Sequence, residues 1–379
     1  MSVSVQVRPA RTFREVGAFI DLPYRLHEGT PWVPPLKIER RMFLSRRFGT
    51  YAKRVDFELF CAWRDGRVVG RISAHIDHAY NRYHDARWGW FGFFESEDDP
   101  EIARALLDAA ERWLRERGME RMVGPADFTP NDESGIVVEG HELPPMVRQP
   151  WHPPYYRRLC EEAGLQKVVD LLMYELDISD REKMLPILPE LAREAREKHG
   201  VRIRRMSRRR LRRDLDVFAR IYNRAWRRNW GFTPYEPSDL DHYAREMQLV
   251  FDRDWFMVAE IDGEPIAVAI TVPDVNQILR RMNGRLLPFG WWWYLRRRKL
   301  IDRVRVGFLG VRPEFQHTGV AAALYLEHFD TSDRHPLIKS GETGWVLETN
   351  RAMNRAMEAM NGRVVKRYRM YERSWADEA

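Results

Sequence analysis

The sequence predicts two tandem α/β domains of related fold. Two hairpin signals carry most of this prediction, because Asp65-Gly66 and Asp262-Gly263 each separate two runs of β-forming residues. The second glycine lies 197 residues after the first (263 − 66). Gly164 and Gly362, which end two predicted helices, lie 198 residues apart (362 − 164). Landmarks that recur in one order at one spacing indicate a duplication.

Length and composition agree with two domains. The chain has 379 residues, of which 44% are hydrophobic, and this is enough for two cores. We expect domains over residues 1–180 and 213–379, joined by a basic junction over residues 181–212. Cys61 and Cys160 lie in apolar predicted elements, so we expect core positions and no disulfide framework. No Cys/His spacing typical of a metal site occurs, and we expect no metal.

A phosphate-binding turn is the strongest functional signal. Residues Val304–Leu324 read as an apolar strand, a turn with a glycine and the start of an Ala-rich helix. The first turn of a helix has unpaired backbone N–H groups and the positive end of the helix dipole, so it binds a pyrophosphate without a lysine. The residues expected to do so are Gln316, His317, Thr318, Gly319, Val320 and Ala321.

The first half differs at this place. Its strand GWFGFFE matches GFLGVRP of the second half if Gly92 corresponds to Gly310. The turn that follows it carries four acidic residues, Glu95, Glu97, Asp98 and Asp99. Repulsion between such charges and a pyrophosphate is of order one to several kcal/mol per pair. We therefore expect a degenerate first copy and one phosphate site, in the second copy.

The order Gln-x-x-Gly-x-Ala after a strand resembles the acyl-CoA-binding loop of the GNAT (Gcn5-related) acyltransferases. The next segments follow the GNAT order: a strand that ends near Asn350, a helix over 351–360, and a terminal strand, 364–371, that closes the sheet. The resemblance implies that each half is a mixed, mostly antiparallel sheet flanked by helices. Segments along nearly the whole chain, among them GPADFTPNDESGIVVEG and RAWRRNWGFTP, also resemble a tandem-GNAT group that includes the bacterial ceramide synthases, which use long-chain acyl-CoA.

The resemblance implies roles for residues of the second half. Acyl-CoA is the implied donor, and a backbone N–H near Gly310 and Val311 is the implied oxyanion donor. Glu348 and Asn350 are the catalytic candidates, although Glu348 is as readily a solvent-exposed residue. Met357 stands where many GNAT enzymes have a tyrosine acid, so the acid is unassigned. Besides the turn, the implied CoA contacts are Leu309, Gly310, Val311, Asn350 and Asn354.

Two segments are candidates for the acceptor site. Asn131, Asp132 and Glu133 follow a strand of the first copy, where carboxylates could hold an ammonium group, but such clusters are also ordinary turns. The second segment follows the first helix of the second copy, and aromatic residues at helical spacing are also typical of a core. Its candidate residues are Trp226, Asn229, Trp230 and Phe232.

The net charge of +7 is concentrated in Arg202–Arg213 and Trp291–Lys299. Three tryptophans and a tyrosine in a row cannot all face one core, so Trp291–Lys299 favours either peripheral contact with an anionic membrane or a lid over an apolar tunnel. The longest apolar run, Leu286–Leu295, is half of the ~20 residues that span a bilayer. We expect a cytoplasmic protein, either free or peripheral at the inner face of the cytoplasmic membrane, with no nucleic-acid partner.

The predicted function is acyl-CoA-dependent N-acylation of a long-chain, sphingoid-type lipid amine. Two alternatives stay open: a GNAT enzyme with a soluble small-molecule or peptide amine as acceptor, and a non-catalytic CoA-binding sensor. The sequence sets neither the acyl length nor the oligomeric state.

Overall fold

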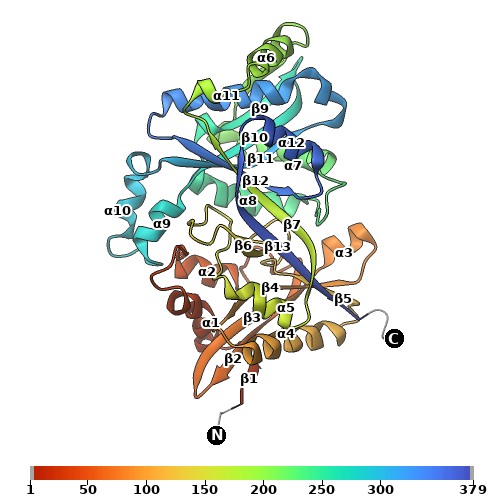
Figure 1. Ribbon diagram of the computed structural model, residues 1–379, viewed down its shortest axis with the longest axis vertical. Coiled ribbons are helices and arrows are strands. Elements are labelled where there is room, and N and C mark those ends of the chain that lie inside the picture. The colour runs from red at the N-terminus through yellow and green to blue at the C-terminus, as the bar shows by residue number, and fades with distance from the viewer. Residues whose placement is uncertain (1–3, 376–379) are drawn as a thin grey trace. The chain divides into compact units, whose positions relative to one another are not determined.

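The computed structural model describes residues 4–375 and consists of two compact units (Figure 1). Unit 1 contains the chain up to Leu171, Leu279–Tyr294, and the chain from Lys366 onward; unit 2 contains Leu172–Ile278 and Leu295–Val365. Neither unit is continuous in sequence, in contrast to the continuous domains that we expected. The chain passes between the units inside two long strands, β7 (Gln166–Asp177) and β13 (Arg363–Ser374).

Unit 1 is a sheet with helices on both faces. Its strand order is β1-β2-β3-β4-β5-β13, and β6 also pairs with β13. The pairs are antiparallel except for the parallel pair β4–β5. The strands are β1 (Gln6–Pro9), β2 (Val55–Arg64), β3 (Arg67–Asp77), β4 (Trp88–Ser96), β5 (Arg121–Gly124) and β6 (Ile136–Glu139). The helices are α1 (Phe13–Leu26), α2 (Lys37–Phe43), α3 (His78–His84), α4 (Pro100–Arg115) and α5 (Tyr155–Glu162).

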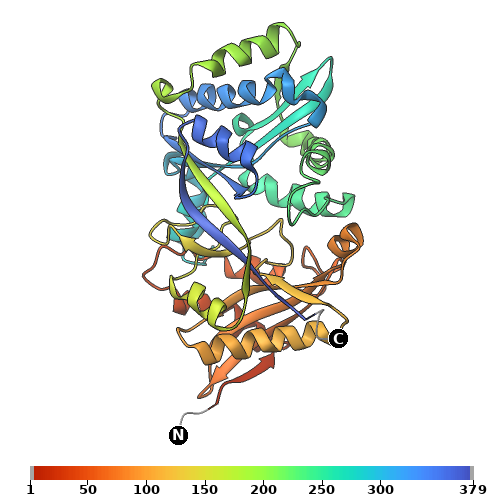
Figure 2. The same ribbon diagram turned by 45° about the vertical axis from the view of Figure 1, so that its right-hand side comes forward.

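Two core clusters cover opposite faces of the unit 1 sheet, as the alternation of side chains along a strand requires. On β2, Phe60 and Ala62 pack with α4, and Leu59 and Cys61 pack with α1. Figure 2 shows α4 along its face of the sheet. Cys61 and Cys160 are free and buried, which confirms their expected core positions.

Unit 2 has the same plan. Its strand order is β8-β9-β10-β11-β12-β7, with a parallel pair β11–β12 beside antiparallel pairs. The expected mixed, mostly antiparallel sheet flanked by helices is confirmed. The strands are β8 (Arg202–Arg205), β9 (Phe256–Ile261), β10 (Glu264–Pro273), β11 (Arg303–Val311) and β12 (Ser340–Leu347). The α-helices of unit 2 are α6 (Ile187–Glu197), α7 (Leu211–Ala225), α8 (Pro237–Val250), α11 (Val320–Arg334) and α12 (Arg351–Ala359). Helix α9 (Asn276–Met282) begins in unit 2 and ends in unit 1, and α10 (Gly290–Leu295) belongs to unit 1 except for its last residue. The 3₁₀ turns are η1 (Arg181–Lys183), η2 (Arg208–Arg210), η3 (Arg253–Trp255), η4 (Arg297–Lys299) and η5 (Pro313–Thr318).

Residues 181–212, expected as a basic junction, are part of unit 2. They form η1, α6, β8 and η2. Ala192 and Ala195 of α6 belong to the same core cluster as Val320 and Ala323 of α11. Arg204 forms ion pairs with Asp214 and Glu260, so part of the arginine run is neutralised inside the unit.

The two central hairpins repeat in detail. Both have positive φ at the two turn residues, 52° and 72° at Asp65-Gly66 and 49° and 81° at Asp262-Gly263, a geometry that Asp-Gly tolerates well. Both carry one extra residue at the same place, Val69 in β3 and Ile266 in β10, again 197 residues apart (266 − 69). The register therefore supports the duplication that the landmarks indicated.

The register also corrects one landmark. Arg71 of β3 is paired with Glu95, and Val268, 197 residues later (268 − 71), is paired with Gly310. Gly310 therefore corresponds to Glu95 and not to Gly92. The two bulges fall at different points, between the Gly92 and Glu95 pairs in β4 and at Gly307 in β11, and a sequence pattern does not reveal this shift.

The terminal strand is a second correction. We expected residues 364–371 to close the sheet of the second half. From Lys366 onward β13 instead pairs with unit 1, where Tyr371 is opposite Gly124 and Arg369 is opposite Ile136. The Arg369 guanidinium also holds the buried Asp170 carboxylate, with Nε 2.9 Å from Oδ1. In unit 2 the corresponding edge of β12 is taken by β7.

Candidate functional site

The strands β11 and β12 of unit 2 are paired over only part of their length. Their parallel ladder runs from Arg303 opposite Ser340 to Val306 opposite Thr343, while the strands continue to Val311 and Leu347. Beyond Val306 the two strands are outside this ladder, and the bulge at Gly307 lies at the point of separation. Because strand backbone outside a ladder can pair with a ligand, this place is suited to an extended amide chain or an oxyanion.

The predicted phosphate turn lies directly after β11. Residues Pro313–Thr318 form η5, and Gly319 is the N-cap of α11 without a side-chain cap. Gln316 and His317 are exposed, and Thr318 is buried with its hydroxyl donating to the Phe315 carbonyl at 2.7 Å. The first N–H groups of a helix without a side-chain cap are suited to an anion.

Gly319 has a packing role of its own. Its φ of 73° lies in the left-handed region, and a Cβ at this position would come within 2.7 Å of the Leu191 carbonyl oxygen of α6. A glycine is therefore required here by the backbone and by α6, whatever the ligand. Substitutions of Gly319 would test folding together with binding, and Ala321 on the first turn of α11 is the better probe.

In unit 1 the end of β4, which corresponds to the end of β11, is bonded to the segment after β5. The Phe91 carbonyl accepts the Ala126 N–H at 2.8 Å, and the Phe93 N–H donates to Asp127 Oδ1 at 2.8 Å. A Cβ on Gly92 would lie 2.2 Å from the Ala126 oxygen. In unit 1 the segment after β5 therefore bonds to the end of β4. In unit 2 the corresponding end of β11 lies beyond its ladder with β12.

The N-terminus of the helix that follows, α4, is also occupied by a side chain of the protein. Asp99 caps α4 by accepting the Glu101 N–H at 2.8 Å, and it forms an ion pair with Arg64 at 2.7 Å. Asp98 forms an ion pair with Arg158. The acidic residues of this turn are thus used within unit 1, in agreement with a degenerate phosphate turn.

Glu95 is not a turn residue but a buried one. Its carboxylate lies 2.7 Å from His27 Nε2, accepts the Tyr156 hydroxyl at 2.7 Å, and lies 3.4 Å from Arg71 Nη2. Burial alone would raise the pKa of Glu95, but the charges of His27 and Arg71 lower it to about 2. Glu95 is therefore ionised and belongs to the core of unit 1.

The catalytic candidates lie at the carboxyl end of β12. Glu348 is half-buried in the turn after the strand. Asn350 caps α12 by accepting the Met353 N–H at 3.2 Å. Asn354 donates to the Leu347 and Glu348 carbonyls and accepts the Tyr174 hydroxyl at 3.1 Å. The two asparagines thus hold the strand end and the helix start in place, and Glu348 is the carboxylate of the set.

Two charged residues near the ladder end were missed by the sequence reasoning. Arg305 of β11 and Glu342 of β12 are opposite each other in the parallel register and are 6% and 3% exposed. Arg305 Nη2 donates to the Gly344 carbonyl at 3.3 Å. Both strands read as apolar runs in the sequence, and the burial of a charge within a strand has no local signal.

The aromatic candidates of the second acceptor segment gather over β11. The ring of Phe232 is 5.4 Å from that of Tyr222, and the ring of Trp226 is 5.4 Å from both Tyr222 and Phe308. Asn229 and Trp230 lie half-buried in the turn after α7, where the Asn229 N–H donates to the Trp226 carbonyl. The structure therefore brings Trp226 to the ladder end, together with Tyr222 and Phe308, which the sequence did not single out.

The acidic candidates of the first acceptor segment are paired. Glu133 lies 2.8 Å from Arg40 Nη2, and Asp132 is buried, lies 3.2 Å from Arg148 and accepts the Tyr51 hydroxyl. The backbone N–H of Asn131 donates to Thr129 Oγ1 at 3.0 Å.

The unusual carboxyl of this segment is its neighbour, Asp127. Burial and the negative charge of Glu133 raise the pKa of Asp127 to about 8, against the influence of Arg40. No sequence pattern around Asp127 indicated that its carboxyl group would be buried.

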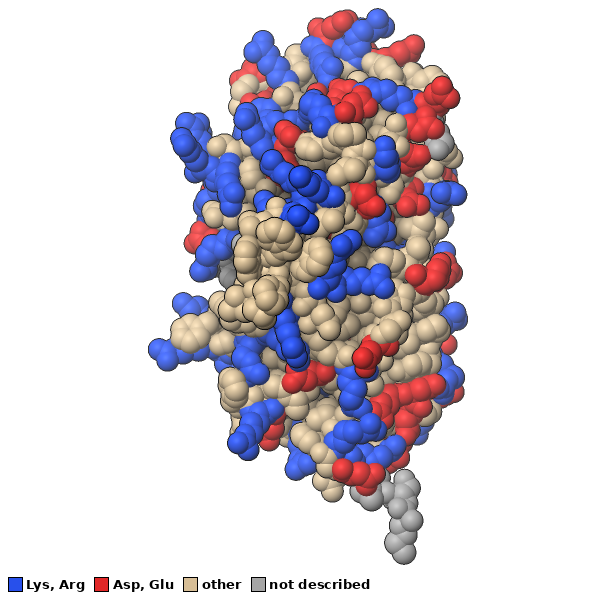
Figure 3. Space-filling model, turned by 90° about the vertical axis from the view of Figure 1, so that its left-hand side faces the viewer, with Lys and Arg blue, Asp and Glu red and all other residues tan. Residues whose placement is uncertain are grey.

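The segment with the three tryptophans is partly exposed. Leu287 and Phe289 are 74% and 75% exposed, and Trp291 and Trp292 are 45% and 44% exposed. Trp293 lies under the Arg281 guanidinium, 5.2 Å from the ring centre. Figure 3 shows the side of the molecule on which α9 and α10 lie, with Lys and Arg beside protruding uncharged groups.

No described helix has both the length and the apolar character to cross a membrane, and no group of His, Cys, Asp and Glu in residues 4–375 is arranged to hold a metal ion.

The fold and the site define an acyltransferase. The sequence model of the acetyltransferase (GNAT) family matches residues 27–134, which lie in unit 1. A tandem GNAT protein from the clavulanic acid biosynthesis pathway superposes with a TM-score of 0.57 at 15% identity, with 98% of each chain covered. A GCN5-related N-acetyltransferase from Sphaerobacter thermophilus gives 0.55 at 13% identity, over 98% of this chain and 95% of that one.

Two relatives match along the whole length. Protein YghO of Escherichia coli is 33% identical over 372 residues, 96% of this chain and 94% of the relative. The bacterial ceramide synthase of Caulobacter vibrioides is 35% identical over 384 residues, 98% of both chains. The chain belongs to the GNAT N-acyltransferases, in the tandem-GNAT group that includes the bacterial ceramide synthases. The GNAT fold implies that it binds CoA or acyl-CoA.

Proposed function

We propose that this N-acyltransferase transfers the acyl group of a long-chain acyl-CoA to the amine of a sphingoid-type lipid, and that unit 2 carries the reaction. The observation that carries the proposal is the separation of β11 from β12 beside an α11 start without a side-chain cap, because unit 1 is closed at both places. The identity to the Caulobacter ceramide synthase supports a lipid amine as acceptor.

The chemistry follows from this geometry. The pyrophosphate binds at the first turn of α11, and the pantetheine arm pairs with Leu309–Val311 on the side of β11 away from β10, beyond the ladder with β12. A backbone N–H near Gly310 and Val311 stabilises the oxyanion when the amine nitrogen attacks the thioester carbon. The carbon–sulfur bond then breaks, and the thiolate leaves without a strong acid, which is consistent with Met357 in place of a tyrosine.

The base must accept a proton from the ammonium group of the acceptor. Glu348 at the end of β12 is our first candidate, and the buried Glu342 of the same strand is the second. Glu348→Gln and Glu342→Gln distinguish them, because loss of the base lowers kcat at neutral pH and the loss shrinks as the pH approaches the pKa of the amine.

The deciding assay is intact-mass or thin-layer analysis of the purified full-length chain with sphinganine and a series of acyl-CoAs. We expect an amide product and stoichiometric release of free CoA. Product with soluble amines alone would favour the soluble-acceptor alternative. CoA binding without any product would favour the sensor.

Membrane contact is part of the proposal. The exposed aromatic side chains of Trp291 and Trp292 suit the headgroup region, and Arg296–Lys299 suit anionic lipids at about 1 kcal/mol for each charge. We expect the protein to sediment with anionic vesicles and to be released by salt. Replacement of Trp291, Trp292 and Trp293 by Ser should lower vesicle binding, whereas Tyr83→Ser, at an exposed aromatic of α3, should not. Unchanged binding of the triple variant would make the segment a lid or a packing element.

A further inference from the structure

Unit 1 exposes large apolar side chains in two of its segments. The first segment contains α1, α2 and the turn after α2, and its exposed side chains, at 61–75%, are Phe13, Ile38, Met42 and Phe48. The second segment is Leu286–Trp292, in which Leu287 and Phe289 are the most exposed. A cluster of exposed apolar groups on a folded protein marks a surface that contacts a partner.

The two segments meet within unit 1, although they are far apart in sequence. The Lys37 N–H at the start of α2 donates to the Gly284 carbonyl at 3.2 Å. A Cβ on Gly284 would lie 2.4 Å from Cε1 of Tyr24 in α1, and the Tyr24 hydroxyl donates to the Pro35 carbonyl just before α2. The backbone that leads into Leu286–Trp292 is therefore fixed against α1 and α2.

Helix α2 lies on the surface with apolar side chains outward. None of its residues, all of which the structure describes, is buried. Ile38 and Met42 are four residues apart and so lie on one face of the helix. Arg41, beside Met42, lies over the Phe13 ring, 3.9 Å from its centre, and donates to the Phe13 carbonyl at 3.2 Å. The exposed side of α2 thus combines apolar groups with a cation.

The charge of both segments is almost entirely positive. Residues 37–48 contain five Lys or Arg and one acidic residue, Glu39, while residues 279–294 contain three arginines and no acidic residue. Several of these cations form no ion pair within the part of the chain that the structure describes: Arg41, Arg47, Arg280, Arg281 and Arg285. Cations that the protein does not neutralise suit anionic headgroups, and apolar side chains beside them suit the layer below.

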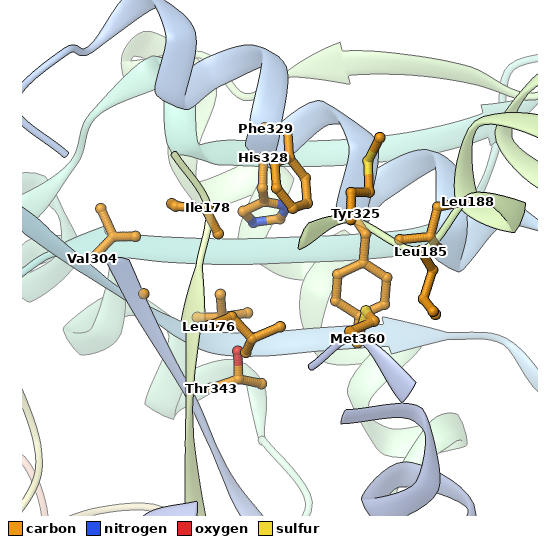
Figure 4. A pocket seen from close by; sticks show the side chains of 13 residues that line it. Leu176, Ile178, Leu185, Leu188, Val304, Tyr325, His328, Phe329, Thr343 and Met360 are labelled. Atoms are coloured by element: carbon orange, nitrogen blue, oxygen red, sulfur yellow. The ribbon is translucent and has the colours of Figure 1, made fainter. Parts of the chain in front are cut away.

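The apolar pocket on the α11 side of the unit 2 sheet is too small for a hydrocarbon chain (Figure 4). Leu185, Tyr325 and Phe329 are among its walls, and its cavity volume is about 30 Å³, room for about two water molecules. A lipid chain finds no place there, whereas the exposed apolar side chains of unit 1 are open to a lipid surface.

We infer that unit 1 docks on an anionic lipid bilayer through a docking surface that consists of Phe13, Ile38, Met42, Phe48 and Leu286–Trp292. The inference rests on the proposed function, extends its membrane contact from the tryptophans to α1 and α2, and gives the degenerate copy a role. A second copy of the chain fits this surface poorly. A two-fold contact would place the cations of one protomer against the same cations of its partner.

Ile38→Ser combined with Met42→Ser tests the docking surface without changing a tryptophan. Both side chains are exposed, so the double variant should fold. Sedimentation of the full-length chain with vesicles of mixed phosphatidylglycerol and phosphatidylcholine gives the partition coefficient. We expect it to fall at least tenfold, because two apolar side chains lose their contact with lipid. Ile187→Ser combined with Leu337→Ser, at exposed positions of unit 2, is the matched control and should bind vesicles as the parent does.

A fluorescent label that responds to polarity locates the contact. Ile38→Cys, Phe289→Cys and Leu337→Cys are labelled in turn, and the native cysteines are buried and should not react. The labels at positions 38 and 289 should both shift to the blue with anionic vesicles and not with neutral ones, and the label at 337 should not shift. A shift at 289 alone would confine the contact to Leu286–Trp292 and overturn the inference. A shift at 38 that grows with protein concentration in the absence of lipid would show that a second copy occupies the surface, and the inference would again be wrong.

Two further readouts separate this inference from the proposed function. The double variant of Ile38 and Met42 should bind CoA in calorimetry as the parent does, because the start of α11 lies in unit 2. If the parent acylates sphinganine and the double variant binds vesicles as well as the parent, only the docking surface is overturned. If the parent forms no amide with sphinganine, the proposed function fails, while the vesicle and label experiments still decide whether unit 1 docks on lipid.

Discussion

Units 1 and 2 share a plan but differ where the parallel strand pair ends. In unit 2, β11 and β12 continue beyond their ladder, and α11 starts without a side-chain cap. In unit 1, Asp127 takes the Phe93 N–H and Asp99 caps α4. In unit 1, two aspartate side chains therefore accept hydrogen bonds from the kind of backbone N–H groups that unit 2 leaves for a ligand. A duplicated fold loses a binding site most simply when its own side chains take the ligand's hydrogen bonds.

The core of unit 1 gives the largest expected effect. Glu95 corresponds by register to Gly310 of unit 2, yet it pairs with His27 inside the core. Glu95→Ala leaves a buried His27 and Tyr156 without their acceptor, and we expect a loss of about 3 kcal/mol in urea unfolding. Glu97→Ala, which removes exposed ion pairs, should cost less than about 1 kcal/mol. A stable Glu95→Ala protein with altered CoA binding would make unit 1 a ligand site and break the comparison.

Asp127 makes the stability of the protein depend on pH. Because its folded pKa is raised to about 8, the folded state binds a proton that the unfolded state has lost, and the associated stability disappears as the pH rises through 8. We expect the free energy of unfolding to fall by about 2 kcal/mol more in the parent than in Asp127→Asn between pH 6 and pH 9. The asparagine keeps an oxygen for the Phe93 N–H. Parallel pH profiles of the two proteins would show that Asp127 is already ionised at pH 6.

Adding a negative charge to the first turn of α11 tests whether the pyrophosphate of CoA binds there. Ala321→Glu places an anion on the first turn, where the helix dipole favours it but a pyrophosphate does not. CoA affinity should fall at least tenfold, about 1.4 kcal/mol, in calorimetry. Ala321→Gln has nearly the same shape without the charge and should bind CoA nearly as the parent does. Equal affinities of the two variants would place the pyrophosphate elsewhere.

Removal of charge from the first copy should have the smallest effect. Asp98→Asn combined with Asp99→Asn removes two negative charges, while asparagine remains a good N-cap, so stability should change by less than about 1 kcal/mol. CoA stoichiometry should remain one per chain. A second bound CoA would show that charge alone, and not the closed backbone at Asp127, keeps unit 1 empty.

Local signals were sufficient for part of the site. The strand, turn and helix around Gln316–Ala321 follow from apolar runs and a glycine, and the structure has a strand, η5 and α11 there. Trp226 and Phe232 came from an aromatic cluster near a predicted helix end. Asp127, Arg305 and Glu342 were missed, because the burial of a charged group depends on elements distant in sequence.

By itself the sequence determined the duplication, the hairpins and the GNAT plan, because turn chemistry, side-chain periodicity and helix ends are local properties of the chain. Tertiary structure decided which strand closes which sheet: β13 pairs with unit 1 and β7 with unit 2, although each strand follows a short helix, α12 and α5, at the corresponding place of its half. It also decided where each bulge falls and so which residue corresponds to Gly310. Strand partners and registers are set by packing and by long-range ion pairs such as Asp170–Arg369, and these contacts join residues too far apart for any local pattern to record.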